Sequence, residues 1–165
     1  MRFNSIMIVT GILTLLVIII LGIISGKEAS GSPIPQYEPS DQERPRIEIT
    51  ENRFDLGRMR VDEKREKEVI LKNTGTAPLV LSNFSTSCDC TFIQMLYQGV
   101  TSEQFSMHSN SAWQGTVAPG TEATIRVIYD PSIMPVAGSI ERSAYFSTND
   151  PDQKQIMLYL TAFVE

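Results

Sequence analysis

Two cysteines that flank a single aspartate are the residues of this 165-residue chain whose type and spacing could do chemistry. In an extended segment, side chains two positions apart lie on the same face, so the sulfur atoms of Cys88 and Cys90 can converge on one point. Three states are open to such a pair. The cysteines could be two buried thiols, they could form a strained local disulfide that is redox-labile, or their thiolates could hold a soft metal ion.

A metal ion would need further ligands, and Met107 and His108 are the candidates. Both lie in the polar segment from Tyr97 to Gln114, which is longer than a sandwich turn needs, and loops of that length are usually functional or disordered. A thioether and an imidazole added to two thiolates suit copper, and two cysteines with a histidine also suit zinc. Each residue alone is more simply a core methionine or a solvated histidine. The hypothesis is a copper or zinc site on Cys88, Cys90, Met107 and His108.

The remaining reactive side chains form no catalytic constellation. Ser106, His108 and Ser109 lack a placed carboxylate, and the chain has no G-x-S-x-G nucleophile elbow. We therefore expect no enzymatic activity and no catalytic residues.

The chain after residue 26 is acidic: it carries 19 acidic residues and 13 basic ones, since Arg2 is one of the 14 basic residues of the whole chain. Nucleic-acid binding needs clustered lysine and arginine, so this acidic body argues against nucleic acid as the main partner.

The segments around the cysteines have the pattern of short β-strands. In the run from Ala123 to Tyr129, apolar side chains alternate, with Ile125, Val127 and Tyr129 on one face. The last run, Ile156 to Val164, alternates in the same way, and it follows a turn at residues 149–152. Residues 46–165 hold about seven such segments, with turn signals between them, and this rhythm predicts an all-β, immunoglobulin-like sandwich.

The first 26 residues differ from the rest of the chain. Residues 6–24 are uncharged and almost all apolar, and a helix of that length would span about 28 Å, close to the hydrocarbon thickness of a bilayer. We expect residues 1–26 to be an N-terminal transmembrane anchor, with a cleaved signal peptide as the alternative. Residues 27–45 contain four prolines and form a flexible linker. Arg2 favours a cytoplasmic N-terminus, which places the domain of residues 46–165 outside the cytoplasm, in the periplasm or at the cell surface.

Several short motifs occur in an order that resembles a known family. They are Phe54–Gly57, Val69–Gly75, Pro78–Leu79, Thr86–Thr91, Ala118–Thr121, Ile125–Pro131 and Ser147–Pro151. The order is similar to that of the bacterial domain-of-unknown-function family 1573. That family is related to the Hydin-type immunoglobulin-like domains of cilia and centrosomes and to the major sperm protein sandwich. Its members usually have glycine between the cysteines, where this chain has Asp89.

The resemblance implies an immunoglobulin-like sandwich that is exported and often tethered to a membrane. It implies no established activity, and it carries over only the cysteine pair as a site. The sequence thus predicts a membrane-anchored, extracytoplasmic module that binds or scaffolds a protein partner. The alternatives are soft-metal binding and a thiol-redox role of Cys88 and Cys90.

Overall fold

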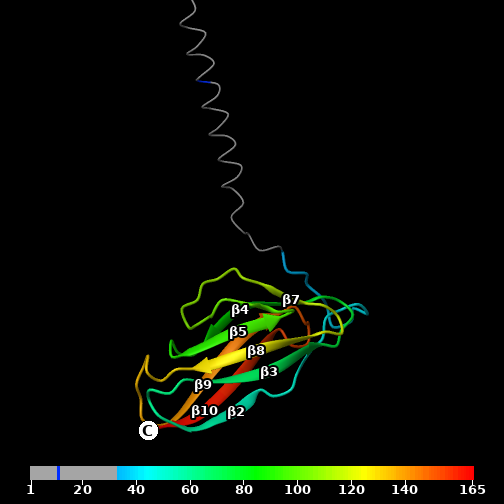
Figure 1. Ribbon diagram of the computed structural model, residues 1–165. Coiled ribbons are helices and arrows are strands. Elements are labelled where there is room, and N and C mark those ends of the chain that lie inside the picture. Colours follow the sequence, from blue (N-terminus) through cyan, green and yellow to red (C-terminus); the bar gives the residue numbers. More distant parts are fainter. Residues whose placement is uncertain (1–10, 12–32) are drawn as a thin grey trace, which may run out of the picture. The chain divides into compact units, whose positions relative to one another are not determined.

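Ten strands in two five-stranded sheets make up the described part of the chain, which comprises Gly11 and residues 33–165 of this computed structural model (Figure 1). The first sheet has the order β1 (Ile47–Ile49), β3 (Arg65–Asn73), β8 (Glu122–Tyr129), β5 (Thr91–Tyr97) and β6 (Val100–Thr101). The second has the order β2 (Arg53–Met59), β10 (Gln155–Val164), β9 (Gly138–Thr148), β4 (Leu79–Thr86) and β7 (Gly115–Val117). Neighbouring strands are antiparallel except for β2 and β10.

The predicted all-β sandwich is confirmed, but the strand number is corrected from about seven to ten in the described residues. The predicted transmembrane segment, residues 6–24, lies outside the described residues apart from Gly11. Within the described part of the chain, no helix combines the length and apolar character that crossing a bilayer requires.

The core forms where the alternating strands turn their apolar faces toward each other. On β10, the inward side chains are the five that the alternation predicts: Ile156, Leu158, Leu160, Ala162 and Val164. On β8, Ile125, Val127 and Tyr129 are buried as predicted. Ile128 is buried as well, although the alternation places it on the outer face, where its cross-strand neighbours are Phe92 and Glu66.

The polar segment after Tyr97 is ordered and contributes to the core. Gln98 and Gly99 have φ values of 50° and 79°, and two such residues make the tight turn that joins β5 to β6. Farther along, Phe105 pairs with Ile93 through backbone hydrogen bonds of 2.9 and 3.0 Å, and only 2% of it is exposed. The segment therefore covers the open edge of β5.

The strand register defines two ends of the sandwich. Arg65, Tyr129 and Thr91 are aligned across β3, β8 and β5, so residues 60–64, 87–90 and 130–137 lie at one end, called here the far end. At the opposite end, Arg44 accepts a hydrogen bond from Thr76 at its carbonyl oxygen (3.0 Å), and its guanidinium lies 2.7 Å from Asp152. Residues 33–46 thus join the domain at this linker end, across the sandwich from the far end (Figure 1).

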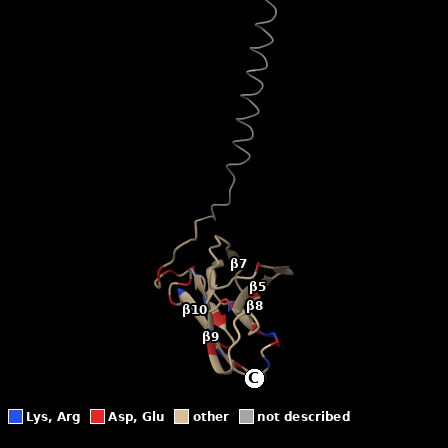
Figure 2. Cartoon of the chain, turned by 90° about the vertical axis from the view of Figure 1, so that its left-hand side faces the viewer, with Lys and Arg blue, Asp and Glu red and all other residues tan. Residues whose placement is uncertain are grey.

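Charged residues of both signs are dispersed over the domain (Figure 2). The segment from Asp62 to Glu68 forms ion pairs within itself and with Arg126 on β8. Arg65 lies 2.7 Å from Glu63, and Arg126 lies 2.7 Å from Glu68 and 3.8 Å from Glu66. Around Glu66, Glu68 and Arg126, the outer face of the first sheet is therefore solvated and carries paired charges.

Candidate functional site

Cys88 and Cys90 form a disulfide in the turn between β4 and β5, with their Cα atoms 5.1 Å apart. Of the three states that the sequence leaves open, this is the one that the structure holds. The amide of Thr91 donates to the carbonyl of Cys88 (3.0 Å), which closes the turn, and the amide of Cys90 donates to the sulfur of Cys88 (3.0 Å). Asp89 lies between them without a positive φ, since Asn83 and Gln98 are the non-glycine residues that have one in the described chain. No glycine is needed at this position.

The turn is hydrogen-bonded to both sheets. Ser87 donates from its amide to the carbonyl of Ser143 on β9 and accepts the amide of Ser143 at its hydroxyl, both at 2.9 Å. The carbonyl of Cys90 accepts the amide of Asp130, which directly follows β8, at 2.9 Å. The pairing of β4 with β9 shifts its register just before the turn, between Ser82 and Ser85, and Asn83 has a φ of 52° there. This bulge lets β4 leave its sheet toward the turn.

A single cation lies beside the buried sulfur atom. The Nε atom of Arg142, on β9, donates to the Sγ atom of Cys90 over 3.4 Å. Tyr129, at the end of β8, lies opposite Thr91, the residue after Cys90. Its hydroxyl is buried and has no hydrogen-bond partner among the described residues. Burial raises the pKa of Tyr129, and the positive charge of Arg142 offsets part of that rise. On its inner side, the disulfide therefore lies against the hydrophobic core and the guanidinium of Arg142.

An exposed methionine lies against the other sulfur atom. The Sδ atom of Met134, in the loop between β8 and β9, is 3.6 Å from the Sγ atom of Cys88. Half of Met134 is exposed, and Ile133 and Val136 in the same loop are exposed as well. The predicted site did not include Met134 or Arg142, which lie 46 and 52 residues beyond their cysteines. The sequence does contain a signal that could have placed Arg142 near the site. Arg142 has the same alternation as the buried Ala144 and Phe146, which predicts that it lies on the inward face of its strand.

The loop tip that holds Met107 and His108 reaches the cysteine turn. The hydroxyl of Ser85 lies 3.4 Å from the carbonyl oxygens of Ser106 and Met107, and the Nε2 atom of His108 lies 3.4 Å from Asp89. The structure therefore brings His108 next to the residue between the cysteines. Met107 is exposed, and the thioether in contact with Cys88 is that of Met134.

The predicted copper or zinc ligands do not form a ready-made metal site in this state. The described residues contain no group of three or more histidine, cysteine, aspartate or glutamate side chains that could hold a metal ion. In a disulfide, the two sulfur atoms are not thiolates, and thiolates are the form that binds metals. A metal ion on these residues would require the reduced pair.

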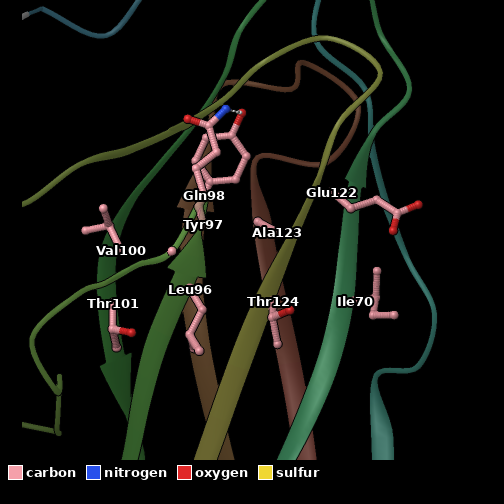
Figure 3. Close-up of a pocket in the computed structure, with 10 residues that line it drawn as sticks. Ile70, Leu96, Tyr97, Gln98, Val100, Thr101, Glu122, Ala123 and Thr124 are labelled. Carbon is pink, nitrogen blue, oxygen red and sulfur yellow. Dashed lines mark hydrogen bonds between the residues drawn. The ribbon is translucent and has the colours of Figure 1, made fainter.

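A hollow lies at the linker end, on the outer face of the first sheet (Figure 3). Its volume is about 390 Å³, and its floor is a row of uncharged side chains aligned across the strands: Ile70, Thr124, Leu96 and Thr101. Val100, which is 70% exposed, forms one wall, and the Lys72–Glu122 ion pair of 3.5 Å borders the row. The hollow is shallow, its floor is uncharged, and its charged lining residue Glu122 is paired with Lys72, so it offers contact area rather than a reactive group.

The immunoglobulin-like character of the sandwich is decided by comparison with known proteins. The family model described as "HYDIN/CFA65/VesB-like, Ig-like domain" matches residues 45–162. The chain belongs to this family. The predicted relation to Hydin-type domains is therefore confirmed, and residues 45–162 of the HYDIN/CFA65/VesB-like chain contain both cysteines and Met134.

Solved structures show the same fold. A protein of unknown function from Porphyromonas gingivalis W83 is 18% identical with a TM-score of 0.56, and the match covers 74% of this chain. The chain spans about half of that protein, 48% of its length. PapD-like domain 7 of human CEP192 is 12% identical with a TM-score of 0.50, and the match covers 84% of this chain and 96% of that domain. At these identities the similarity shows the fold alone. No curated protein matches the chain.

Proposed function

We propose that this HYDIN/CFA65/VesB-like chain is a membrane-anchored, extracytoplasmic module that binds a protein partner at the far end of its sandwich and has no catalytic activity. The observation that carries this proposal is a set of large apolar side chains that remain exposed on the two loops that reach the disulfide turn, called here the apolar rim: Met107, Ile133, Met134 and Val136. Gathered apolar side chains on a soluble domain are typical of interaction surfaces. The Ig-like family supports a binding role rather than catalysis.

The position of the rim also suits a tethered binding module. Residues 33–46 join the sandwich at the linker end, and β8 runs from Glu122 at that end to Tyr129 at the far end. Eight residues of strand cover about 23 Å, so the rim lies a full strand length beyond the point of attachment. With residues 6–24 as the anchor, the chain would be tethered through the end of the domain opposite the rim. The resemblance to family 1573, whose members are exported and often tethered, supports the same arrangement.

Two features favour a protein as the partner. The rim consists of uncharged residues, and the basic residues of the domain are dispersed along the chain instead of clustered (Figure 2). Methionine is flexible and adapts to different apolar surfaces, which is why it is common at protein-binding sites. A protein surface with apolar side chains is therefore the occupant that fits the rim.

Photo-crosslinking from single positions tests the binding site. A photoreactive amino acid replaces Ile133 in the full chain, expressed in its native host, and the matched control carries it at Met157, an exposed apolar position on the second sheet. We expect one defined crosslinked species from position 133 and none from position 157. Equal crosslinking from both positions, or none from position 133, would refute the proposal. A product with twice the mass of the chain would identify a second copy as the partner.

The location of the domain has a separate test. If residues 1–26 anchor the chain and residues 46–165 lie outside the cytoplasm, the chain should sediment with membranes and resist extraction by high salt. Protease added to intact cells or spheroplasts should remove the domain. Protection of the domain until the cells are lysed would contradict the extracytoplasmic location.

As a second function, we propose soft-metal binding by the reduced cysteine pair, with copper or zinc as the ion. The observation that favours it is that His108 lies 3.4 Å from Asp89, between the two cysteines, while Met107 lies next to it at the loop tip. Titration of the fully reduced chain with Cu(I) against a chromophoric competitor tests it. The affinity should fall on replacing both cysteines with serine, and it should fall to a smaller extent in His108→Ala and Met107→Leu. Equal affinity of the wild-type chain and the double serine variant would exclude the site.

A further inference from the structure

We infer that the Cys88–Cys90 disulfide exchanges with thiols in a fixed direction, in which the incoming thiolate attacks Cys88 and Cys90 leaves as a thiolate beside Arg142. The thiol that reacts with it belongs to a dithiol-bearing protein that contacts the apolar rim, and this identification of the partner class rests on the proposed function. The direction of the exchange does not rest on it, because the surroundings of the two sulfur atoms determine which one is attacked.

Access decides which sulfur atom is attacked. Cys90 is completely buried, whereas 7% of Cys88 is exposed. The side chain in contact with the sulfur of Cys88 is Met134, whose thioether is half exposed and lies on a loop between two proline residues. A methionine side chain has three rotatable bonds and can swing aside. A thiolate that arrives from solvent or from a bound partner therefore reaches Cys88 and not Cys90.

The charge beside Cys90 makes it the better leaving group. A thiolate buried without a partner would be costly, but Arg142 already donates to the Cys90 sulfur over 3.4 Å. None of the ion pairs in the described part of the chain involves Arg142, so no carboxylate neutralises its charge. A neighbouring cation stabilises a thiolate through its charge, and a stabilised thiolate leaves more readily in exchange. Cys88 receives only a neutral donor, the amide of Cys90.

The exchange balances in two steps. In the first, a thiolate of the partner attacks the Cys88 sulfur, the bond between Cys88 and Cys90 breaks, and its electron pair goes to Cys90. The product is a mixed disulfide between the partner and Cys88. In the second step, the partner's other cysteine, as a thiolate, attacks the partner's sulfur atom in the mixed disulfide. The bond to Cys88 breaks, and Cys88 leaves as a thiolate. The partner is oxidised to a disulfide, and the cysteine pair is reduced by two electrons and takes up the two thiol protons.

Glutathione, a monothiol, tests the direction without any protein partner. The full chain in mild detergent is exposed briefly to glutathione, free thiols are blocked with N-ethylmaleimide, and tandem mass spectrometry locates both groups. We expect glutathione on Cys88 and maleimide on Cys90, with at least a tenfold excess over the opposite pattern. An even distribution, or glutathione mainly on Cys90, would overturn the inference.

Variants of Arg142 test the leaving group. Arg142→Gln should slow the opening of the disulfide by glutathione about three- to tenfold, because the Cys90 thiolate loses its cation. Arg142→Lys should restore most of the rate, which a purely structural role of the guanidinium would not predict. The matched control is Arg126→Gln, which removes the same charge from the outer face of the first sheet and should leave the rate unchanged. Equal rates in the two glutamine variants would contradict the role of Arg142.

The outcomes separate this inference from the proposed function. Mapping of glutathione to Cys88 with a rate that depends on Arg142 supports the directed exchange, even if position 133 gives no crosslink. Crosslinking at position 133 together with a reversed or random glutathione pattern would support the proposed binding site and refute the directed exchange. A Cys90→Ser variant, which keeps Cys88 as the single thiol, should attack the oxidised, disulfide form of a dithiol protein and form a mixed disulfide, with the protein's second cysteine released as a thiol. Cys88→Ser should react more slowly, because Cys90 is buried.

Discussion

Replacing Phe105 with alanine should destabilise the domain strongly, although the residue lies in a polar segment between β6 and β7. Its ring is 98% covered, and it stacks on Phe84 with ring centroids 5.1 Å apart and lies 5.5 Å from Trp113. Truncating a buried phenylalanine costs about 3–5 kcal/mol. Aromatic pairs add to that cost, while the backbone pairing with Ile93 does not depend on the side chain and should persist. We therefore expect a loss of about 4 kcal/mol in the free energy of unfolding.

Urea denaturation measures this loss. The chain has a single tryptophan, Trp113, which contacts Phe105 and reports the packing of this segment, and circular dichroism follows the sheets independently. The matched control is Phe163→Ala, a ring that is 37% exposed and lies under Arg58 at 4.6 Å. An exposed cation–π contact contributes about 0.5–1 kcal/mol, so the control should lose about 1 kcal/mol.

The comparison of the two phenylalanine variants is decisive because small domains have a total stability of only about 5–15 kcal/mol. A loss in Phe105→Ala no larger than that in Phe163→Ala would refute the conclusion that the segment is part of the core. Loss of the tryptophan signal without a change in the circular dichroism midpoint would also refute it, because the segment would then unfold independently of the sheets.

Three further predictions concern single side chains. Asn73→Ala should lower the free energy of unfolding in urea by about 2–4 kcal/mol, because its buried amide donates to the carbonyls of Ala77 and Val117 (2.9 and 3.0 Å). Tyr129→Phe should be neutral or stabilising, since it removes an unpartnered hydroxyl. Because burial raises the pKa of Tyr129 in the folded state, the wild-type chain should lose stability as the pH rises above 10.0, the ordinary value, and the melting temperature of the variant should fall less between pH 8 and pH 11. Met134→Ala should speed the opening of the disulfide by glutathione, because it uncovers Cys88, and an unchanged rate would show that Met134 does not limit access.

The strands with one buried face could be predicted from sequence because burial imposes a strict alternation. This holds for β8 and β10, whose inward residues are the predicted ones. Alternation cannot predict β6 and β7, because they have only two and three residues. β6 exists because it pairs with β5, and β7 because it pairs with β4. Phe105 is missed for the same reason: a single apolar residue in a polar segment has no period, and only the aromatic side chains it meets show where it belongs.

The cysteine pair could be identified as a site from its spacing, but its surroundings could not. Spacing alone is compatible with two thiols, a disulfide or a metal site, and the structure holds the disulfide. The contact of Met134 with Cys88 depends on how a loop more than forty residues away folds back. Arg142 was predictable in part, because a charged residue at an inward position of a strand requires a partner inside the sandwich. What that partner is follows only from the packing of β9 against the cysteine turn.

The place of the disulfide in the topology connects its redox state to the apolar rim. The chain crosses from the second sheet to the first at residues 87–90, between β4 and β5, and it crosses back at residues 130–137, between β8 and β9. The two crossings touch, through the sulfur atoms of Cys88 and Met134 and through the hydrogen bond from Asp130 to Cys90. Opening the disulfide removes a constraint on the crossing at residues 87–90. The rim residues Ile133 and Met134 lie on the crossing at residues 130–137, which the first crossing contacts. A partner that reduces the pair would therefore change the surface to which it is bound, and its affinity for the oxidised and reduced chains should differ.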